Sequence, residues 1–228
     1  MSLGQIENSS LRDRVAAKLR DAILNGELIP GQMLVESDIA SELGVSRAPI
    51  REAFQILSAE GLVESIPYHG TNVRNLSQTD VEELYSLRSV LEEFAVRRVI
   101  SRNDPEALAH LRELYDAMVD AAENSDLERA SKLDRSFHDG LIEASCHQML
   151  SHTWNPVSLR VQQVMALRQI RRNISTPQEI KQIAYSHLPI IEAIAEANEE
   201  KAVSLISEHI ATSGDLVAAD WKRQEEKS

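Results

Sequence analysis

The sequence lacks the features of secreted and membrane-spanning proteins. Its 228 residues include one cysteine, Cys146, so an internal disulfide framework is excluded and a reducing compartment is favoured. No apolar run approaches the roughly 18 residues that a membrane-spanning helix needs, and no basic segment followed by an apolar one opens the chain. We therefore expect a cytoplasmic protein without a membrane segment.

Motifs of several common enzyme classes are also missing. The sequence contains no Walker phosphate loop, no GxGxxG fingerprint, no serine nucleophile elbow and no HExxH zinc helix. It contains no internal repeat and no low-complexity segment. These absences remove the usual sequence evidence for nucleotide-binding, serine-hydrolase and zinc-protease activity.

Positive charge is scarce in both halves of the chain. The formal net charge is −12: residues 1–76 hold 7 Lys or Arg against 10 Asp or Glu, and residues 77–228 hold 17 against 26. Nucleic-acid binding would therefore have to rest on a local basic face and should weaken steeply with salt. The length, with 43% hydrophobic and 26% charged residues, fits two modest globular domains.

The most informative stretch, 44–57, reads as an amphipathic helix that follows a glycine turn. Its core-facing stripe comprises Ile50, Ala53, Phe54 and Leu57. Its outward polar face comprises Arg47, Arg51, Gln55 and Ser58. Ser46 is a favourable N-cap, and Gly44 separates this helix from a shorter one over 38–43 that Ser37 can cap. This pattern is typical of a helix-turn-helix for the DNA major groove, where arginine can bind guanine with two hydrogen bonds.

The flanking segments complete a winged helix-turn-helix. A first helix is expected over 10–25, and alternating residues over 62–66 and 71–73 predict a small β-hairpin wing. Beyond a polar linker at 75–78, capping signals and apolar periodicity predict an all-helical bundle. Its six helices are expected at 80–101, 105–123, 126–145, 147–173, 177–199 and 200–221. Pro189 should kink or split the fifth. The fold class is therefore mainly α, with a DNA-binding domain over 9–76 and a helical domain over 79–222.

Four residues of the helical half are candidates for a metal site. Asp134 and His138 are one helical turn apart, and His187 and His209 lie on two later helices. Three imidazoles and a carboxylate could bind zinc, nickel, manganese or cobalt. The alternative is that these are ordinary surface or core histidines, since the chain has seven.

Two further groups allow both a functional and an ordinary interpretation. Arg88 and Glu92 form an i, i+4 pair that is either a simple intrahelical salt bridge or a buried guanidinium for a carboxylate ligand. Asn155 and Arg160 either face a pocket or lie on solvated helix surface. An apolar set on the same segment belongs either to the bundle core or to a dimer interface: Met149, Trp154, Val157, Val161 and Val164.

The chain resembles the GntR family of bacterial transcription regulators. The segments that carry this resemblance in the first half are 19–28, 30–31, 43–53 and 60–63. The helical half is similar to the FCD effector-binding domain of the FadR-type branch, through Leu87-Arg88 with Leu91-Glu92, Asp134 with Phe137-His138, His187 with Ile190, and Glu208-His209-Ile210. Six helices are similar to the VanR-like subgroup. Together the resemblance covers residues 10–220.

The resemblance implies a homodimer that binds a palindromic operator, usually as a repressor. Carried over by position, the DNA contacts are Ser37, Ser46, Arg47, Ala48, Arg51, His69 and Gly70. Ser37 departs from the pattern, which has an arginine there. The metal ligands would be Asp134, His138, His187 and His209, with zinc as the first choice among the divalent transition metals. A small carboxylate effector would bind through Arg88, Glu92, Asn155 and Arg160.

Two other functions stay open on the sequence alone. A metal site with open coordination positions could activate water in an enzyme acting on a small organic acid. Alternatively, the chain could be a helical interaction protein with a degenerate DNA-binding domain, which would bind neither operator nor metal. Effector, metal and operator identity are not readable from the sequence.

Overall fold

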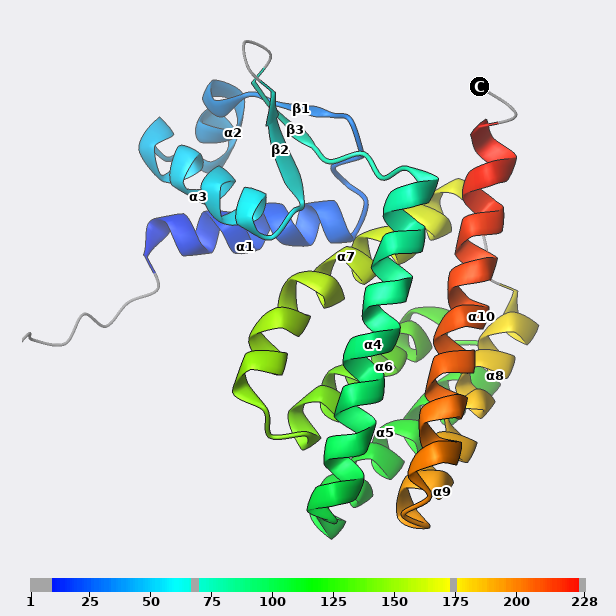
Figure 1. Ribbon diagram of the computed structural model, residues 1–228. Coiled ribbons are helices and arrows are strands. Elements are labelled where there is room, and N and C mark those ends of the chain that lie inside the picture. Colours follow the sequence, from blue (N-terminus) through cyan, green and yellow to red (C-terminus); the bar gives the residue numbers. More distant parts are fainter. Residues whose placement is uncertain (1–9, 67–69, 173–175, 226–228) are drawn as a thin grey trace, which may run out of the picture. The chain divides into compact units, whose positions relative to one another are not determined.

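The computed structural model describes residues 10–66, 70–172 and 176–225, and the chain divides into two compact units after Leu76. The predicted fold class is confirmed: the first unit combines three helices with a small sheet, and the second is helical (Figure 1). The domain limits 9–76 and 79–222 remain predictions.

The first unit is built around the helix-turn-helix. Its helices are α1 (Leu11–Leu24), α2 (Glu36–Leu43) and α3 (Arg47–Ala59). The predicted apolar stripe of α3 is buried, with Ile50, Ala53 and Leu57 fully inaccessible, and it packs against α1. Gly44 ends α2 in the left-handed conformation, at a φ of 66°, which glycine adopts without steric cost.

The wing has one strand more than the sequence predicts. Strands β2 (Val63–Ile66) and β3 (Gly70–Val73) form the expected antiparallel hairpin, with Val63 opposite Val73. A third strand, β1 (Met33–Leu34), pairs antiparallel with β3, so the order is β1-β3-β2. A two-residue strand leaves no alternating pattern long enough to detect.

Two predicted helix starts are wrong. The N-cap of α2 is Val35 rather than Ser37, which lies inside the helix and donates its hydroxyl to the Asp38 carboxylate at 3.0 Å. In the second unit, the capping box is formed by Ser77 and Asp80, so α4 begins at Gln78. At α4, Thr79 competes with Ser77 as a cap, since Ser and Thr have similar capping strength. At α2 the N-cap is a valine, which capping preferences do not predict.

The second unit is a bundle in which α4 packs along α10 and α5 along α6 (Figure 1). Its helices are α4 (Gln78–Arg102), α5 (Pro105–Glu123), α6 (Leu127–Ala144), α7 (Gln148–Arg172), α8 (Pro177–Ser186), α9 (Leu188–Ala195) and α10 (Glu199–Glu225). Among the described helices, none has the length and apolarity that a membrane crossing requires.

The predicted fifth helix is split at Pro189, so the described part of this unit has seven helices instead of six. A proline at that position lacks an N–H and its ring clashes with the carbonyl four residues earlier. The chain therefore ends α8 at Ser186 and restarts as α9 at Leu188, with His187 between them. The six-helix count that suggested the VanR-like subgroup holds only if α8 and α9 are counted as one broken helix.

Gly214 allows α10 to approach α4 closely. A Cβ atom at this position would lie 3.1 Å from the Cβ, Cγ and Cδ1 atoms of the buried Tyr85.

We expect Gly214→Val to lower the free energy of unfolding by about 1–3 kcal/mol, because the added methyl groups meet a side chain already packed in the core. Urea unfolding followed by circular dichroism measures this loss. Ala211→Val, on an exposed position of the same helix, is the control and should change stability by about 0.5 kcal/mol or less; equal losses would contradict the close-packing role.

Candidate functional site

The predicted recognition helix presents its two arginines to the outside. Arg47 is the first residue of α3 and Arg51 lies one turn later, and both side chains are exposed, on another face than the buried stripe. The Nε atom of Arg51 lies 3.8 Å from a carboxylate oxygen of Glu36 on α2. Both guanidinium groups can therefore reach a ligand outside the unit.

The other predicted DNA contacts lie around this helix. Ser46 and Ala48 are exposed at the start of α3, and Ser37 is half-buried on α2. Gly70 is exposed where β3 begins, with a φ of 91°. His69 lies outside the described residues. These positions remain predictions, since nothing in the geometry distinguishes a phosphate contact from ordinary surface.

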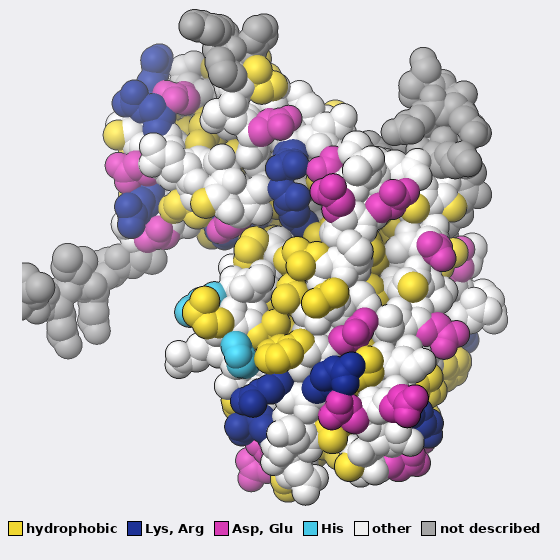
Figure 2. Space-filling view, viewed as in Figure 1, with side chains coloured by type: hydrophobic (Ala, Val, Ile, Leu, Met, Phe, Trp, Pro, Cys, Tyr) yellow, Lys and Arg dark blue, Asp and Glu magenta, His cyan; other side chains and the backbone are white. Residues whose placement is uncertain are grey.

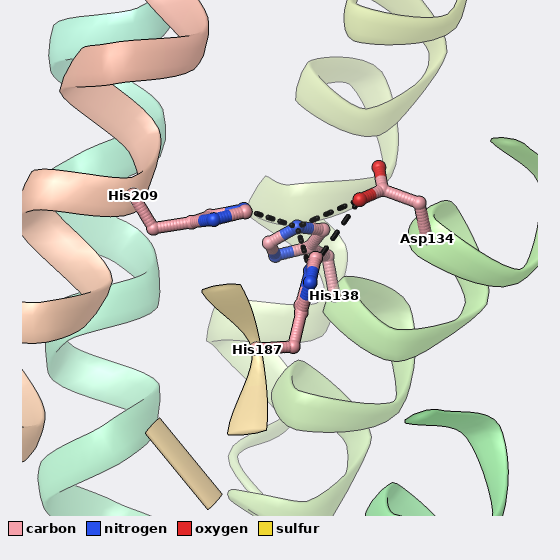
Figure 3. A group of neighbouring side chains, drawn as sticks. All are labelled: Asp134, His138, His187 and His209. Atoms are coloured by element: carbon pink, nitrogen blue, oxygen red, sulfur yellow. Dashed lines mark hydrogen bonds and ion pairs between the residues drawn. The ribbon is translucent and has the colours of Figure 1, made fainter. Parts of the chain in front are cut away.

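The four predicted metal ligands converge inside the helical unit (Figure 3). Asp134 and His138 project from α6, His187 from the α8–α9 junction and His209 from α10. The Nε2 atom of His138 lies 3.4 Å from that of His187 and 3.3 Å from that of His209. A carboxylate oxygen of Asp134, Oδ1, lies 3.4 Å from the His187 Nε2 atom. All four ligand atoms lie within 4.8 Å of one another.

Each imidazole is held from its outer side, through Nδ1. His138 Nδ1 bonds a carboxylate oxygen of Glu92 at 2.5 Å, and His187 Nδ1 bonds the backbone carbonyl of Ile183 at 2.8 Å. His209 Nδ1 bonds the hydroxyl of Ser186 at 2.8 Å, and that hydroxyl already donates its hydrogen to the Ile183 carbonyl. Because all three partners accept hydrogen bonds, all three Nδ1 atoms carry the hydrogen.

This hydrogen bonding leaves the inner atoms of the cluster without hydrogen. A neutral imidazole protonated at Nδ1 has a lone pair at Nε2. Three such lone pairs face one another and Asp134 Oδ1, which is buried and accepts no hydrogen bond from any described residue. Neighbouring lone pairs repel unless a cation lies among them, and buried polar atoms without partners are rare. The cluster is therefore built to receive positive charge.

The donor set fits a first-row divalent metal ion. Three imidazole nitrogens and a carboxylate oxygen are ligands that zinc, nickel, manganese and cobalt accept. Around a tetrahedral ion with bonds of about 2.0–2.1 Å, neighbouring ligand atoms lie about 3.3–3.4 Å apart. The three short separations in the cluster match this spacing. The four residues could therefore hold a metal ion.

The break between α8 and α9 supplies two of the groups that hold the imidazoles from outside the cluster. In an unbroken helix the Ile183 carbonyl would accept the amide of His187, but that amide bonds Ala184 instead, at 3.3 Å. The Ile183 carbonyl is thus available to the side chains of Ser186 and His187. The helix break predicted from Pro189 therefore helps to orient two of the three imidazoles, those of His187 and His209.

Arg88 and Glu92 form an intrahelical i, i+4 salt bridge, as the ordinary interpretation expected, and this pair is buried. The Arg88 Nε atom donates to Glu92 at 2.6 Å, and the two side chains are 5% and 0% exposed. Glu92 uses its second oxygen for His138, so it links the guanidinium to the histidine cluster. In this geometry Glu92 positions His138, and the effector role of the pair remains a prediction.

Burial keeps the three histidines neutral. It lowers the pKa of His138 and His209 well below the ordinary value. It also lowers the pKa of His187, where Asp134 and hydrogen bonds to the Ile183 and Ala184 carbonyls oppose the shift. The positive charge of Arg88 adds to the lowering of the pKa of His138. Neutral imidazoles have their lone pairs free, so metal binding requires no proton to be displaced near neutral pH.

A small cavity adjoins the cluster. Its lining includes His209 and Asp134 from the cluster and three further polar side chains, Tyr85, Arg88 and Arg168. Its volume is about 30 Å³, room for one or two water molecules, whereas ligand pockets typically have about 300–1,000 Å³. An organic acid could bind beside the cluster only if the surrounding helices moved apart.

The structure does not bring Asn155 and Arg160 to this cavity. Asn155 is exposed and Arg160 is half-buried, and neither lines the cavity, so their predicted effector role has no support from the geometry. Arg168, which the sequence reasoning missed, is 3% exposed and lines it. The signal was present, because Arg168 continues the helical spacing of the inward stripe Val157, Val161 and Val164.

Comparison with known proteins agrees with both halves of this description. The family described as "Bacterial regulatory proteins, gntR family" matches residues 11–73, and the FCD domain family matches residues 83–212. A probable D-xylose utilization operon transcriptional repressor of Paenarthrobacter nicotinovorans is 32% identical over 88% of this chain and 87% of its own. The gluconate operon transcriptional repressor of Bacillus subtilis is 26% identical over 96% and 90%.

Solved structures share the fold. A putative GntR transcriptional regulator from Rhodococcus sp. RHA1 is 28% identical, covers 91% of this chain and 97% of its own, and superposes with a TM-score of 0.74. The McbR protein of Escherichia coli superposes with a TM-score of 0.78 at 22% identity, over 93% and 99% of the two chains. The families and relatives are transcription regulators, which removes the enzyme alternative.

We expect Glu92→Gln to weaken metal binding about 10–100-fold, because the variant loses the carboxylate that holds the Nδ1 hydrogen of His138. Competition between the protein and a chromogenic zinc chelator measures the affinity. Glu93→Gln is the matched control, since Glu93 bonds Ser89 on the same helix and is not a partner of His138.

Ser186→Ala provides a milder version of the same test. It removes the acceptor of His209 Nδ1 and leaves the buried Arg88–Glu92 pair intact. Unchanged zinc affinity in both Glu92→Gln and Ser186→Ala, with folding verified by circular dichroism, would show that the outer hydrogen bonds do not orient a metal site.

Proposed function

The chain belongs to the GntR family of bacterial regulatory proteins and carries an FCD domain, and on that premise we propose that it is a dimeric repressor controlled by a small carboxylic acid. The acid binds beside a divalent metal ion held by Asp134, His138, His187 and His209. The observation that carries the proposal is a cluster of hydrogen-free ligand atoms next to a cavity lined by two buried guanidinium groups.

In this proposal, helix α3 of each of two copies binds the DNA. We propose that Arg47 and Arg51 contact bases or adjacent phosphates, with Ser37, Ser46, Ala48, His69 and Gly70 near the backbone and minor groove. The exposure of both arginines on the outward face of α3 supports this assignment. The domain limits are 9–76 for DNA binding and 79–222 for metal and effector binding, and such a regulator acts in the cytoplasm, where its operator lies.

The effector site combines charge neutralisation with metal coordination. When bound, the divalent ion supplies a Lewis-acidic position for a carboxylate oxygen. Arg88 and Arg168 line the same cavity. Burial lowers the pKa of Arg88, but Glu92, Tyr85 and Asp134 together more than offset this effect, so the pKa is raised and Arg88 stays charged. The two guanidinium groups favour an anionic ligand and disfavour a neutral one of the same shape.

The chemistry of the cavity favours sugar acids, hydroxy acids and dicarboxylates. The names of two relatives, which refer to a D-xylose utilization operon and a gluconate operon, support a sugar-derived member of this class. We propose zinc as the ion, with nickel, manganese or cobalt as alternatives that the donor set also accepts.

Effector binding changes operator affinity through the shape of the helical unit. The cavity is closed to about 30 Å³, so an acid selects a conformation in which the helices around it are displaced. The ligand shifts the balance between the two states only by its difference in affinity for them. We propose that the acid-bound state releases the operator.

A thermal-shift screen with and without a strong chelator tests the effector site. We expect one small carboxylic acid to raise the melting temperature of the metal-loaded protein, because an acid present at 100 times its Kd stabilises the folded state by about 2.7 kcal/mol. Chelation should abolish this shift. Stabilisation that survives chelation would contradict a shared metal and effector site, and no shift from any acid would contradict the ligand class.

Arg47→Ala tests the recognition helix. Against duplexes selected from a random library by the wild-type protein, we expect the variant to lose about 1–3 kcal/mol of binding free energy per recognition helix. Fluorescence anisotropy at two salt concentrations measures the loss. Arg112→Ala, an exposed arginine of the helical unit, removes the same charge and should bind like wild type. Operator selection that fails even at low salt would favour the degenerate interaction protein instead.

A further inference from the structure

One wall of the cavity beside the cluster comes from a short helix. Four long helices line the rest of it: α4, α6, α7 and α10 have 25, 18, 25 and 27 residues. Helix α8 has 10 residues, and among the described residues it lines the cavity through Ile183 alone. The side chain of Ile183 is half-buried. A single apolar side chain therefore closes the cavity on this side.

Helix α8 is also the least firmly packed of these five helices. Each of the four long helices buries at least five side chains in its described part, whereas α8 buries only Ala184. The free energy of local opening grows with the apolar surface that an element buries. Displacing α8 therefore costs less than displacing any other wall of the cavity.

The long helices close the cavity from the other side. Helix α4 packs along α10, and in Figure 2 their side chains cover the interior of the helical unit. Helix α8 packs against α5 and α6 instead, and it lies behind α10 in this view (Figure 1). A ligand that entered between α4 and α10 would have to separate two long helices, whereas entry at α8 requires one short helix to move.

The end of α8 that adjoins the cluster is anchored. His187 directly follows α8, and its buried ring lies in the cluster. Ser186, the last residue of α8, bonds the His209 ring at 2.8 Å. Just beyond, Pro189 supplies no backbone N–H, so the helical hydrogen bonding is interrupted there. The chain can bend at this break, and a metal ion held by His187 would keep the pivot in place.

Two polar contacts hold the rest of α8 against the bundle, and we name them the latches of α8. Glu123, the last residue of α5, accepts hydrogen bonds from Lys181 at 2.7 Å and from the Tyr185 hydroxyl. Near the start of α8, a carboxylate oxygen of Glu179 lies 4.0 Å from Nη2 of the cavity residue Arg168. The Glu123 and Lys181 side chains are 47% and 28% exposed, and exposed ion pairs contribute little to stability. The latches therefore release easily.

We propose that α8 is the lid of the effector cavity, with its pivot at His187 and its two latches at Glu123 and Arg168. This inference rests on the proposed function and identifies the wall that moves. A carboxylic acid in the cavity competes with Glu179 for Arg168, because both present a carboxylate to one guanidinium group. Binding therefore weakens one latch, and the open and closed states differ in affinity for the acid, as a population shift requires.

Hydrogen exchange of the full-length protein, followed by mass spectrometry, measures the opening of α8 without any ligand. We expect the backbone amides of residues 181–186 to exchange faster than those in the middle of α6 and α10. Glu123→Ala removes one latch and should accelerate exchange in α8 roughly threefold or more, while α6 and α10 keep their wild-type rates.

Asp120→Ala is the matched control for this experiment. Asp120 also lies on α5 and makes an exposed ion pair, but its partner Arg129 is on α6. Exchange in α8 should therefore keep its wild-type rate in this variant. Unchanged exchange of α8 in Glu123→Ala would overturn the lid, and so would an acceleration that is spread equally over all helices.

Zinc serves as the probe for access to the cavity, because Asp134 and His209 of the cluster line it. With α8 as the gate, Glu123→Ala should speed zinc uptake and zinc transfer to a small chelator by the same factor, roughly threefold or more. The equilibrium affinity for zinc should then stay at its wild-type value. A purely structural contact would change release alone, so faster release without faster uptake would overturn the lid.

Cross-linking provides the reverse test. In a Cys146→Ser background, the combination of Glu123→Cys with Lys181→Cys removes a latch and should exchange zinc faster than wild type. A short bismaleimide that joins the two new cysteines within one chain should then slow the exchange below the wild-type rate. The same polypeptide before coupling is the control. Equal rates before and after complete coupling would overturn the lid.

The lid and the proposed function can fail separately. A protein that binds neither zinc nor any acid, but whose α8 exchange still responds to Glu123→Ala, would contradict the proposed function and leave the local opening of α8 standing. A protein that binds an acid at the metal site equally fast before and after the cross-link would contradict the lid alone.

Discussion

The constraint on which the metal-binding geometry depends is that each of the three buried imidazoles uses its Nδ1 atom for a partner outside the cluster. Glu92, Ser186 and the Ile183 carbonyl each take the hydrogen of one Nδ1 atom, so the inner face contains lone pairs and a carboxylate oxygen. The interior of a protein gives such a group no water to bond. The fold therefore provides a place for positive charge from within.

Helix α4 links the cavity beside the cluster to one of the imidazoles. Its Arg88 lines that cavity, and its Glu92 bonds both Arg88 and His138. A ligand that engaged Arg88 would therefore also act on the position of His138, because a helix is a rigid element over a few turns. In the proposed function, effector and metal ion would thus be coupled through contacts on one helix.

How well the sequence predicts a structural feature depends on whether residues near one another in the chain encode it. The buried stripe of α3 and the Pro189 break follow from local rules of spacing and capping, and they are found where those rules put them. The convergence of His187 and His209 on the Asp134–His138 pair was expected from the family resemblance, because local spacing does not show which residues of separate helices meet. Arg168 was missed because an arginine that follows an apolar stripe is normally taken to mark the end of the buried face. Leu87 lies in an apparent apolar run with Leu84 and Leu91, yet it is exposed, because the inward face of α4 includes Arg88 and Glu92 among its apolar residues. Which face of a helix is buried depends on tertiary partners as well as on hydrophobic spacing.

The acidity of the chain bears on the proposed dimer. Both halves carry excess negative charge, so the long-range field of the protein repels DNA, and the proposed operator binding would rest on the exposed arginines of α3. A single recognition helix in that setting would bind weakly. Two helices held at a fixed separation would bind far more strongly, because the second contact becomes intramolecular, and this gain is lost when the geometry no longer allows both at once. Weak individual contacts would thus suit the proposed switch, because a change in the spacing of two copies would release the operator, whereas two strong contacts would hold it in either state.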